Sequence, residues 1–478
     1  MAGQASYDAL TDVFRGRLLD EGLDMRNVGG TLYLYRGGAW NIMSVEDHAF
    51  ITRMLYEIAR EQGFAIAEKK SRVWDNLHMA IDHLPMAALD QTPKIALLNG
   101  TYDLETETLG EHDPDDYTTR RVNVEFDPKA KCPEWDAMLL RCVSDKPKEV
   151  QEQYIEFLQQ LFGMSLLGFP PTTPRDLRKA VFLIGETGTG KTSIADVLRE
   201  MFHEGEVATE NIAQISKDFG LQTLMSSRAY IADDAADKKT KMNPVIFKKL
   251  ITGEAMTAAI KYQPNRSFRY RGPVVITSNT RPEIEDETDA MYNRMMVLTF
   301  TRIFSLADKE ALAPFKAVVP FLKSRKQFPG IFNWALEGGK IAKELGRYPD
   351  IAEAKVNAQE WRAENDVVFD YLRRFGEADE TSYCSVPLMA QMISLFATIE
   401  HHARRKEWPA KKVSNLLVAQ IATAFPTASI KRYDRADASG NVIVGLRLSE
   451  EGAGWQQKAK EADMIPPGVR WKINGKVL

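Results

Sequence analysis

A short glycine-rich stretch has the residue types and spacing that bind phosphate groups. Gly185, Gly188 and Gly190 are followed directly by Lys191 and Thr192. Glycines let backbone N–H groups turn inward around phosphate oxygens, where the positive end of a following helix favours negative charge. We expect the Lys191 ammonium to reach the β- and γ-phosphates and the Thr192 hydroxyl to hold Mg²⁺. The residues predicted to bind the phosphates are Gly185, Glu186, Thr187, Gly188, Thr189, Gly190, Lys191, Thr192 and Ser193.

The elements that would position this loop are visible on both sides of it. Residues 181–184 form an apolar run typical of a buried parallel strand. The apolar residues that repeat at helical spacing on the other side are Ile194, Val197, Leu198, Met201 and Phe202. A bare Gly/Lys/Thr pattern also arises by chance, but the order of strand, loop and helix is the one that a P-loop requires. The sequence therefore predicts a site for a nucleoside triphosphate.

Two later strands end in polar residues that suit the same chemistry. The run AYIA at residues 229–232 is followed by Asp233 and Asp234. The run PVVITS at residues 273–278 is followed by Asn279. We expect the first of these strands to lie directly beside the P-loop strand, where Asp233 would bind the metal and Asp234 would polarise the attacking water. Asn279 would sense the γ-phosphate. The alternative is that the Asp pair forms an ordinary turn or helix cap and that Asn279 merely ends a strand.

The segment between these two strands has the character of a nucleic-acid contact. Residues 255–262 and 267–270 predict an antiparallel hairpin that turns around residues 263–265. Its tip and flanks carry cations interleaved with aromatic side chains, namely Lys261, Tyr262, Arg266, Phe268, Arg269, Tyr270 and Arg271. Cations suit phosphates and aromatic faces suit bases, so this composition fits single-stranded nucleic acid. The alternative is a solvated hairpin whose aromatic side chains pack inward.

Several motifs together resemble those of superfamily 3 helicases, most closely the primase-helicase type of phages, plasmids, mobile islands and poxviruses. The motifs are GETGTGKT, AYIADDA, KKLITGEAMTAAIK, VVITSNTRP and DAMYNRMMVLTF. Residues 97–135 are similar to the segment before the helicase core of that family, and residues 328–350 to the helical segment after it. The resemblance covers about residues 30–450. No primase catalytic motif precedes this region, so we expect a stand-alone helicase or a helicase fragment.

The resemblance implies roles for individual residues. The glycines with Lys191 and Thr192 match the Walker A motif, Asp233 and Asp234 match Walker B, and Asn279 matches sensor 1. The cofactors implied are ATP and Mg²⁺. The hairpin residues predicted to bind DNA are Lys261, Tyr262 and Arg266. In such helicases the hairpin projects into a central channel and grips one DNA strand.

Arg294 matches the arginine finger that a neighbouring subunit supplies in this family. Its positive charge would stabilise the transferring phosphoryl group. Relatives often carry two adjacent arginines at this place, whereas this chain has Asn293 and Arg294, so Arg302 stays open as the finger. An exposed arginine at the end of a strand is the structural alternative for Arg294. A finger supplied by a neighbour places each active site between two copies, and head-to-tail repetition of that interface closes a ring. The family implies a homo-hexamer.

Composition limits the remaining possibilities. A chain of 478 residues is expected to form roughly two to four domains. The hydrophobic share of 44% and the charged share of 27% are those of a soluble globular protein, and the net charge of -4 shows no global preference for nucleic acid. Three scattered cysteines are too few for a disulfide framework or a cysteine-based zinc site. The sequence has no apolar stretch long enough for an export signal or a membrane span, so we expect the protein to be located in the cytoplasm of a bacterial host cell.

The predicted fold is an α/β P-loop (AAA-plus-like) core flanked by an N-terminal α+β region and a C-terminal winged-helix-like domain. The boundaries are residues 1–165 for the N-terminal region, 166–305 for the core, 306–351 for a helical lid or linker, and 352–478 for the C-terminal domain. The latter is predicted to be mostly helical before a strand pair at residues 428–433 and 442–448. Its basic residues, which are expected to contact duplex DNA, are Arg404, Arg405, Lys406, Lys411, Lys412, Lys431, Arg432 and Arg435.

These features predict an ATP-dependent DNA helicase that acts in the replication of a phage, plasmid or mobile genetic element. ATP hydrolysis at subunit interfaces would drive translocation on single-stranded DNA and at forks, with a primase or polymerase as a candidate partner. One alternative is a nucleotide-dependent origin-binding or regulatory DNA-binding ATPase without unwinding activity. Another is a small-molecule kinase with a P-loop, which would not respond to DNA.

Overall fold

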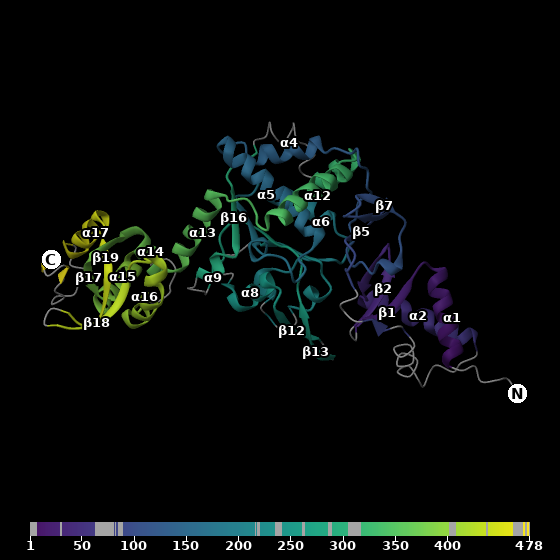
Figure 1. Cartoon of the computed structure of the whole chain (residues 1–478), viewed down its shortest axis with the longest axis horizontal. Helices are drawn as coiled ribbons and strands as arrows, with labels where there is room; N and C mark the ends of the chain where they lie inside the picture. The colour runs from purple at the N-terminus through teal and green to yellow at the C-terminus, as the bar shows by residue number, and fades with distance from the viewer. Residues whose placement is uncertain are drawn as a thin grey trace. The chain divides into compact units, whose positions relative to one another are not determined.

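A computed structural model describes the fold of the chain (Figure 1). The described residues are 7–28, 31–62, 81, 83–84, 89–215, 217, 220–234, 241–260, 263–284, 289–304, 317–400, 408–435, 438–461, 472–473 and 476–477. The chain divides into two compact units, the first made of residues 1–240, 245–280 and 296–352, and the second of residues 241–244, 281–295 and 353–478. The predicted domain boundaries stay predictions.

The first unit begins with two helices and a small sheet of order β3-β2-β1-β4. The bounds are α1 Tyr7–Asp20, β1 Asp24–Val28, β2 Thr31–Arg36, β3 Ala39–Ile42, α2 Val45–Glu61 and β4 His83–Leu84. Gly37 and Gly38 have φ angles of +60° and +80° in the turn between β2 and β3. Phe14, Ile51 and Ile58 are among the fully buried residues of its core. Ser44 and Asp47 close a capping box at the start of α2.

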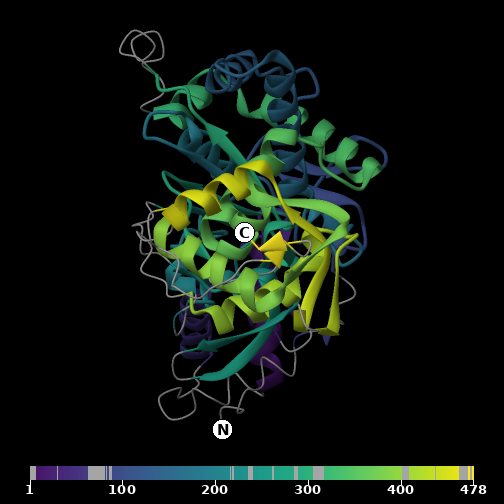
Figure 2. The same cartoon turned by 90° about the vertical axis from the view of Figure 1, so that its left-hand side faces the viewer.

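A meander and a helical layer connect this region to the central sheet. The bounds are β5 Lys94–Leu97, β6 Gly100–Asp103, β7 Thr108–Gly110, α4 Pro133–Cys142, α5 Lys148–Leu167, α11 Val318–Ser324 and α12 Phe328–Leu345. A break at residues 143–147 separates α4 from α5. Figure 2 shows the cartoon of Figure 1 turned by 90° about the vertical axis.

Glycines let α5 and α12 approach each other closely. A Cβ atom at Gly163 would lie 2.1 Å from the carbonyl oxygen of Ala335 and 2.2 Å from the backbone nitrogen of Gly339. We expect Gly163→Ala to lower the free energy of unfolding by about 2–3 kcal/mol, because the backbone of α12 must move to admit the methyl group. Urea unfolding followed by circular dichroism measures this change.

A glycine in open space provides the control. Gly16 on α1 is exposed, and a Cβ atom there would meet nothing within 4 Å. Gly16→Ala should leave stability unchanged or raise it by about 0.5–1 kcal/mol, since alanine favours the helix. Equal stability of the two variants would contradict the close helix crossing.

The centre of the first unit is a five-stranded sheet of order β16-β8-β14-β10-β9. The bounds are β8 Ala180–Gly185, α6 Lys191–Glu200, β9 Val207–Ala208, α7 Ile212–Ile215, β10 Ala229–Asp234, α8 Pro244–Thr252, β12 Ala255–Ile260, β13 Gln263–Arg269, β14 Val274–Ser278 and β16 Met295–Phe300. The pairs β8–β14, β14–β10 and β10–β9 are parallel. The chain therefore has a mixed α/β fold with a parallel sheet.

One prediction about this sheet is wrong. The strand that ends in Asp233 was expected to lie directly beside the P-loop strand, but β14 lies between β8 and β10. The residues of β14 are all buried, as are Ala229 to Ala232 of β10. Because both strands carry the same apolar pattern, the sequence does not distinguish which of them enters the gap beside β8.

The second unit contains an antiparallel sheet of order β17-β19-β18 with helices packed on it. The bounds are β11 Lys241–Met242, β15 Glu283–Ile284, α9 Asp289–Tyr292, α13 Ala352–Asn365, α14 Val367–Phe375, β17 Gly376–Ser385, α15 Val386–Glu400, α16 Ala410–Ala424, β18 Ser429–Arg435, β19 Ala438–Leu448, α17 Glu450–Glu461, β20 Lys472–Ile473 and β21 Lys476–Val477. The predicted strand pair is confirmed as β18 and β19. Its core includes Tyr371, Ile393, Phe396 and Ile443, all fully buried.

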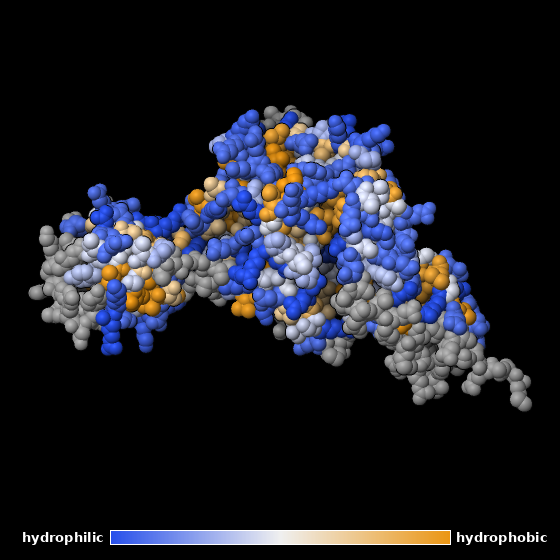
Figure 3. All heavy atoms as spheres, viewed as in Figure 1, coloured by the Kyte–Doolittle hydropathy of each residue, from blue (hydrophilic) through white to orange (hydrophobic). Residues whose placement is uncertain are grey.

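The prediction contains no strand at the position of β17, because seven of the ten residues in its sequence GEADETSYCS are acidic or carry a hydroxyl group. Hydrophilic residues cover much of the face shown in Figure 3, as the charged share of the sequence leads one to expect.

Within the described part of the chain, no helix combines the length and the apolar character needed to cross a membrane.

Candidate functional site

The glycine-rich loop connects the end of β8 to the start of α6 in a closed turn. Thr189 Oγ1 donates a hydrogen bond to the carbonyl oxygen of Glu186 at 2.9 Å. Gly188 and Gly190 have φ angles of +89° and +87°, which favour glycine. A Cβ atom at Gly190 would also lie 2.5 Å from Cys142 Sγ, so glycine is required there for space as well as for backbone angle.

Lys191 opens α6 with a buried ammonium group. Its residue is 5% exposed, and Nζ donates a hydrogen bond to the carbonyl oxygen of Glu186 at 3.0 Å. Burial lowers the pKa of Lys191, and the negative charge of Asp233 partly opposes this effect. A desolvated cation beside a glycine loop is stabilised when an anion binds next to it. Thr192, the next residue, is exposed in the first turn of the helix.

Asp233 lies at the carboxyl end of β10 and is held from two sides. Its Oδ1 accepts a hydrogen bond from Thr277 Oγ1 at 2.7 Å, and its Oδ2 accepts one from Arg199 Nη2 at 3.3 Å. Thr277 comes from the neighbouring strand β14, in register with Asp233. The Asp233 side chain remains 46% exposed. The backbone of Asp234 pairs with that of Ser278, and the side chain of Asp234 lies outside the described residues.

The sequence reasoning missed Arg199, Thr277 and a second carboxylate, Asp196. Arg199 Nη1 bonds to Asp196 Oδ1 within α6, so the guanidinium lies between two acidic side chains. Burial raises the pKa of Asp196, with Asp233 adding to the effect and Arg199 opposing it. Thr192, Asp196 and Arg199 have i, i+4, i+7 spacing, which places them on one helix face. That spacing could have indicated Asp196 and Arg199 as residues on the same helix face as Thr192, but it does not identify Asp233 as their partner, and it does not apply to Thr277 on β14.

Asn279 follows β14 and lies next to the glycine-rich loop. Its Nδ2 donates a hydrogen bond to Thr187 Oγ1 at 3.5 Å, the outer limit for such a bond. Parallel pairing of β8 with β14 explains the contact, because Ser278 is in register with Ile184. The structure therefore brings Lys191, Asp233 and Asn279 to one edge of the parallel sheet.

The predicted hairpin is present as β12 and β13, which Figure 1 shows extending from the first unit. Its turn differs from the prediction, because β12 ends at Ile260 and β13 begins at Gln263. Residues 263–265 therefore belong to β13. Lys261 and Tyr262 lie outside the described residues. Arg266 is exposed and pairs with Ala258 across the hairpin.

Arg294 belongs to the second unit. It follows α9, and its backbone N–H donates a hydrogen bond to the carbonyl oxygen of Met291 at 3.0 Å. Its residue is partly exposed. Its role as an arginine finger stays a prediction, as does the alternative role of Arg302.

Two family models match parts of the chain. Residues 11–144 match the family described as D5 N terminal like, which supports the predicted likeness to phage and plasmid primase-helicases. Residues 183–294 match a family of unknown function, DUF5906, over the stretch from within β8 to Arg294. No curated protein matches the chain.

Solved structures also show a weak similarity. The A form apo structure of the NrS-1 C terminal region has a TM-score of 0.45 and 13% identity, and the match covers 90% of this chain and 98% of that one. The apo structure of the NrS-1 C terminal region (305–718) has a TM-score of 0.40 and 13% identity, with 93% of this chain and 100% of that one covered. Scores at this level do not assign a fold.

Proposed function

We propose that the protein is an ATP-dependent DNA helicase of superfamily 3 that acts in the replication of a phage, plasmid or mobile genetic element. The observation that carries this proposal is the gathering of Lys191, Asp233 and Asn279 at the carboxyl edge of one parallel sheet. The D5 N terminal like match over residues 11–144 supports the replication context. The weak similarity to the NrS-1 structures adds nothing to this proposal.

The residues at this edge fit ATP and Mg²⁺. The loop offers backbone N–H groups through glycines with positive φ, and Lys191 offers a buried positive charge to the β- and γ-phosphates. The exposed Thr192 and the half-exposed Asp233 carboxylate supply oxygen ligands of the kind that Mg²⁺ prefers. When bound, the metal ion would neutralise charge on the phosphate oxygens.

Different side chains of the protein would have different roles in hydrolysis. Lys191 holds the phosphates, Asp234 orients the attacking water and accepts its proton, and Asn279 contacts the γ-phosphate beside Thr187. Arg294 of a neighbouring copy stabilises the charge that develops on the transferring group. This arrangement places each site between two copies, and head-to-tail repetition of such an interface closes a ring when the rotation between copies allows it. We propose a homo-hexameric ring, because this is the number of copies that the family resemblance implies.

Two regions are proposed to contact DNA. The hairpin of β12 and β13 would grip a single strand through Lys261, Tyr262 and Arg266. The order α14, β17, α15, α16, β18, β19 around a three-stranded antiparallel sheet supports a winged-helix interpretation of the second unit. Lys431 and Arg432 on β18 are exposed and suit phosphate contacts.

Steady-state ATP hydrolysis with and without single-stranded DNA tests the proposal. We expect hydrolysis that requires Mg²⁺ and that single-stranded DNA accelerates. A small-molecule kinase would show no response to DNA. Hydrolysis and DNA binding without strand separation would instead favour an origin-binding or regulatory ATPase.

A further inference from the structure

Arg199 joins the P-loop helix to the strand that ends in Asp233. It lies on α6, and its Nη2 donates hydrogen bonds both to Asp233 Oδ2 and to the backbone carbonyl oxygen of Ile231 within β10, each at 3.3 Å. Its Nη1 bonds to Asp196 on its own helix. The Arg199 guanidinium therefore bonds to two groups of β10, the Asp233 carboxylate and the Ile231 carbonyl. It also bonds to the Asp196 carboxylate of α6.

The three charged side chains around this contact are partly exposed, whereas the threonine that also holds Asp233 is buried. The Arg199 side chain is 26% exposed and that of Asp196 is 38% exposed. Thr277, which holds the other oxygen of Asp233, is 3% exposed. A planar guanidinium can bond two carboxylates at once through different nitrogens, whereas a lysine ammonium is a single point charge. The Asp233 carboxylate is thus fixed through both of its oxygens.

We propose that Arg199 is a positioning residue for the metal-side carboxylate. It holds Asp233 in one orientation against the P-loop helix and offsets the negative charge that Asp233 shares with Asp196. This inference rests on the proposed ATPase, and it concerns a residue outside the motifs that the sequence singles out. Misplacement of a reacting group by a fraction of an ångström lowers rates steeply, so the loss of one anchor should reduce turnover.

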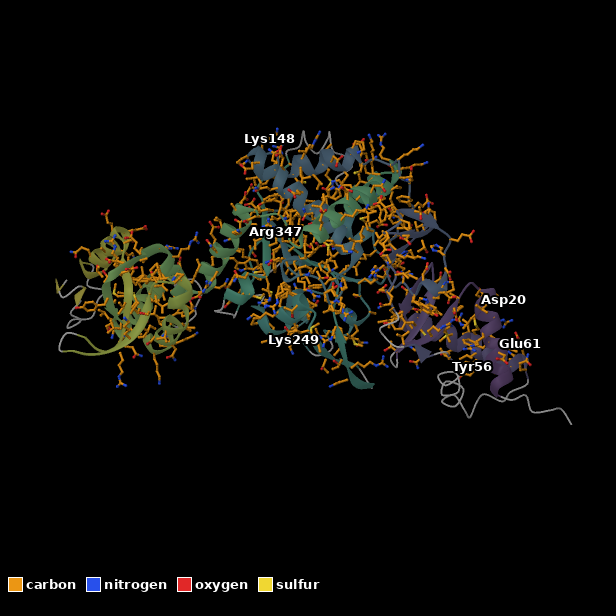
Figure 4. The ribbon with its side chains drawn as sticks, in the orientation of Figure 1. Asp20, Tyr56, Glu61, Lys148, Lys249 and Arg347 are labelled. Carbon is orange, nitrogen blue, oxygen red and sulfur yellow. The ribbon has the colours of Figure 1, made fainter. Side chains whose placement is uncertain are left out.

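Two substitutions separate orientation from charge. Arg199→Lys keeps the positive charge but loses the planar set of N–H donors that bonds both carboxylates. Arg199→Gln loses the charge as well. We expect kcat for ATP hydrolysis to fall about tenfold in both variants. Arg347 is exposed and its side chain is labelled in Figure 4, so Arg347→Gln is the matched control and should retain wild-type turnover.

Binding of a fluorescent ATP analogue gives a readout that needs no hydrolysis. Without Mg²⁺, all variants should bind the analogue within about twofold of the wild type. The Mg²⁺ concentration that half-saturates analogue binding should fall about threefold in Arg199→Gln, because a cation beside the metal-side carboxylate is lost, and stay unchanged in Arg199→Lys. A purely structural role would lower thermal stability without changing this Mg²⁺ dependence.

The outcomes distinguish this inference from the proposed function. Wild-type turnover and an unaltered Mg²⁺ dependence in both Arg199 variants would overturn the positioning role. A wild-type protein that binds the analogue without hydrolysing ATP would overturn the helicase proposal, and the Mg²⁺ dependence of Arg199→Gln would still decide whether Arg199 acts on Asp233.

Discussion

Replacing Lys191 with alanine is expected to lower the rate of ATP hydrolysis by about 10²–10³-fold. Lys191 is buried at the start of α6. Its loss removes the charge that stabilises the phosphate oxygens as the bond to the leaving group breaks. Phosphate release under saturating ATP and Mg²⁺ measures the effect.

Lys148→Ala is the matched control for this substitution. Lys148 begins α5, its side chain is 89% exposed, and Figure 4 labels it at the surface. Its exposed pair with Glu152 contributes little to stability, so turnover should match the wild type. If Lys191→Ala hydrolysed ATP as fast as Lys148→Ala, the glycine-rich loop would not be the site of hydrolysis.

Replacing Lys261 with alanine is expected to abolish DNA unwinding and to spare basal ATP hydrolysis. Lys261 falls in the sequence between β12 and β13, whereas the proposed ATP-binding residues follow β8, β10 and β14. A cation at the tip of a hairpin would hold the phosphates of the translocating strand, while the chemistry takes place at the sheet edge. Parallel assays of strand separation and of phosphate release measure the two effects.

Lys148→Ala also serves as the control for Lys261→Ala, because it removes one positive charge from an exposed position. It should unwind DNA at the wild-type rate. Normal unwinding by Lys261→Ala would show that the hairpin is assigned wrongly, whereas loss of both activities would indicate that Lys261 acts on the ATPase site rather than on DNA.

The local parts of the site could be predicted from the sequence because each depends on a few consecutive residues. The apolar run before Gly185 forms β8, and the helical repeat after Lys191 forms α6, as expected. The hairpin of β12 and β13 follows from its apolar and polar alternation, although residues 263–265, which were predicted to form its turn, belong to β13. The roles of the residues in these elements remain predictions that only activity measurements can test.

The parts that depend on long-range pairing could not be predicted. The position of β14 between β8 and β10 follows from the packing of two strands with the same apolar pattern. The contact of Arg199 with Asp233 depends on how α6 lies against β10. The buried ion pair of Arg121 with Glu206, at 2.6 Å, joins residues far apart in the chain. No local pattern specifies such partners.

Unwinding of a labelled forked duplex with ATP and Mg²⁺, run beside Lys191→Ala, tests the central claim most directly. We predict that the wild-type protein separates the strands and that Lys191→Ala does not. Binding of the fork and hydrolysis of ATP by the wild type without any strand separation would contradict the helicase and favour a DNA-binding ATPase.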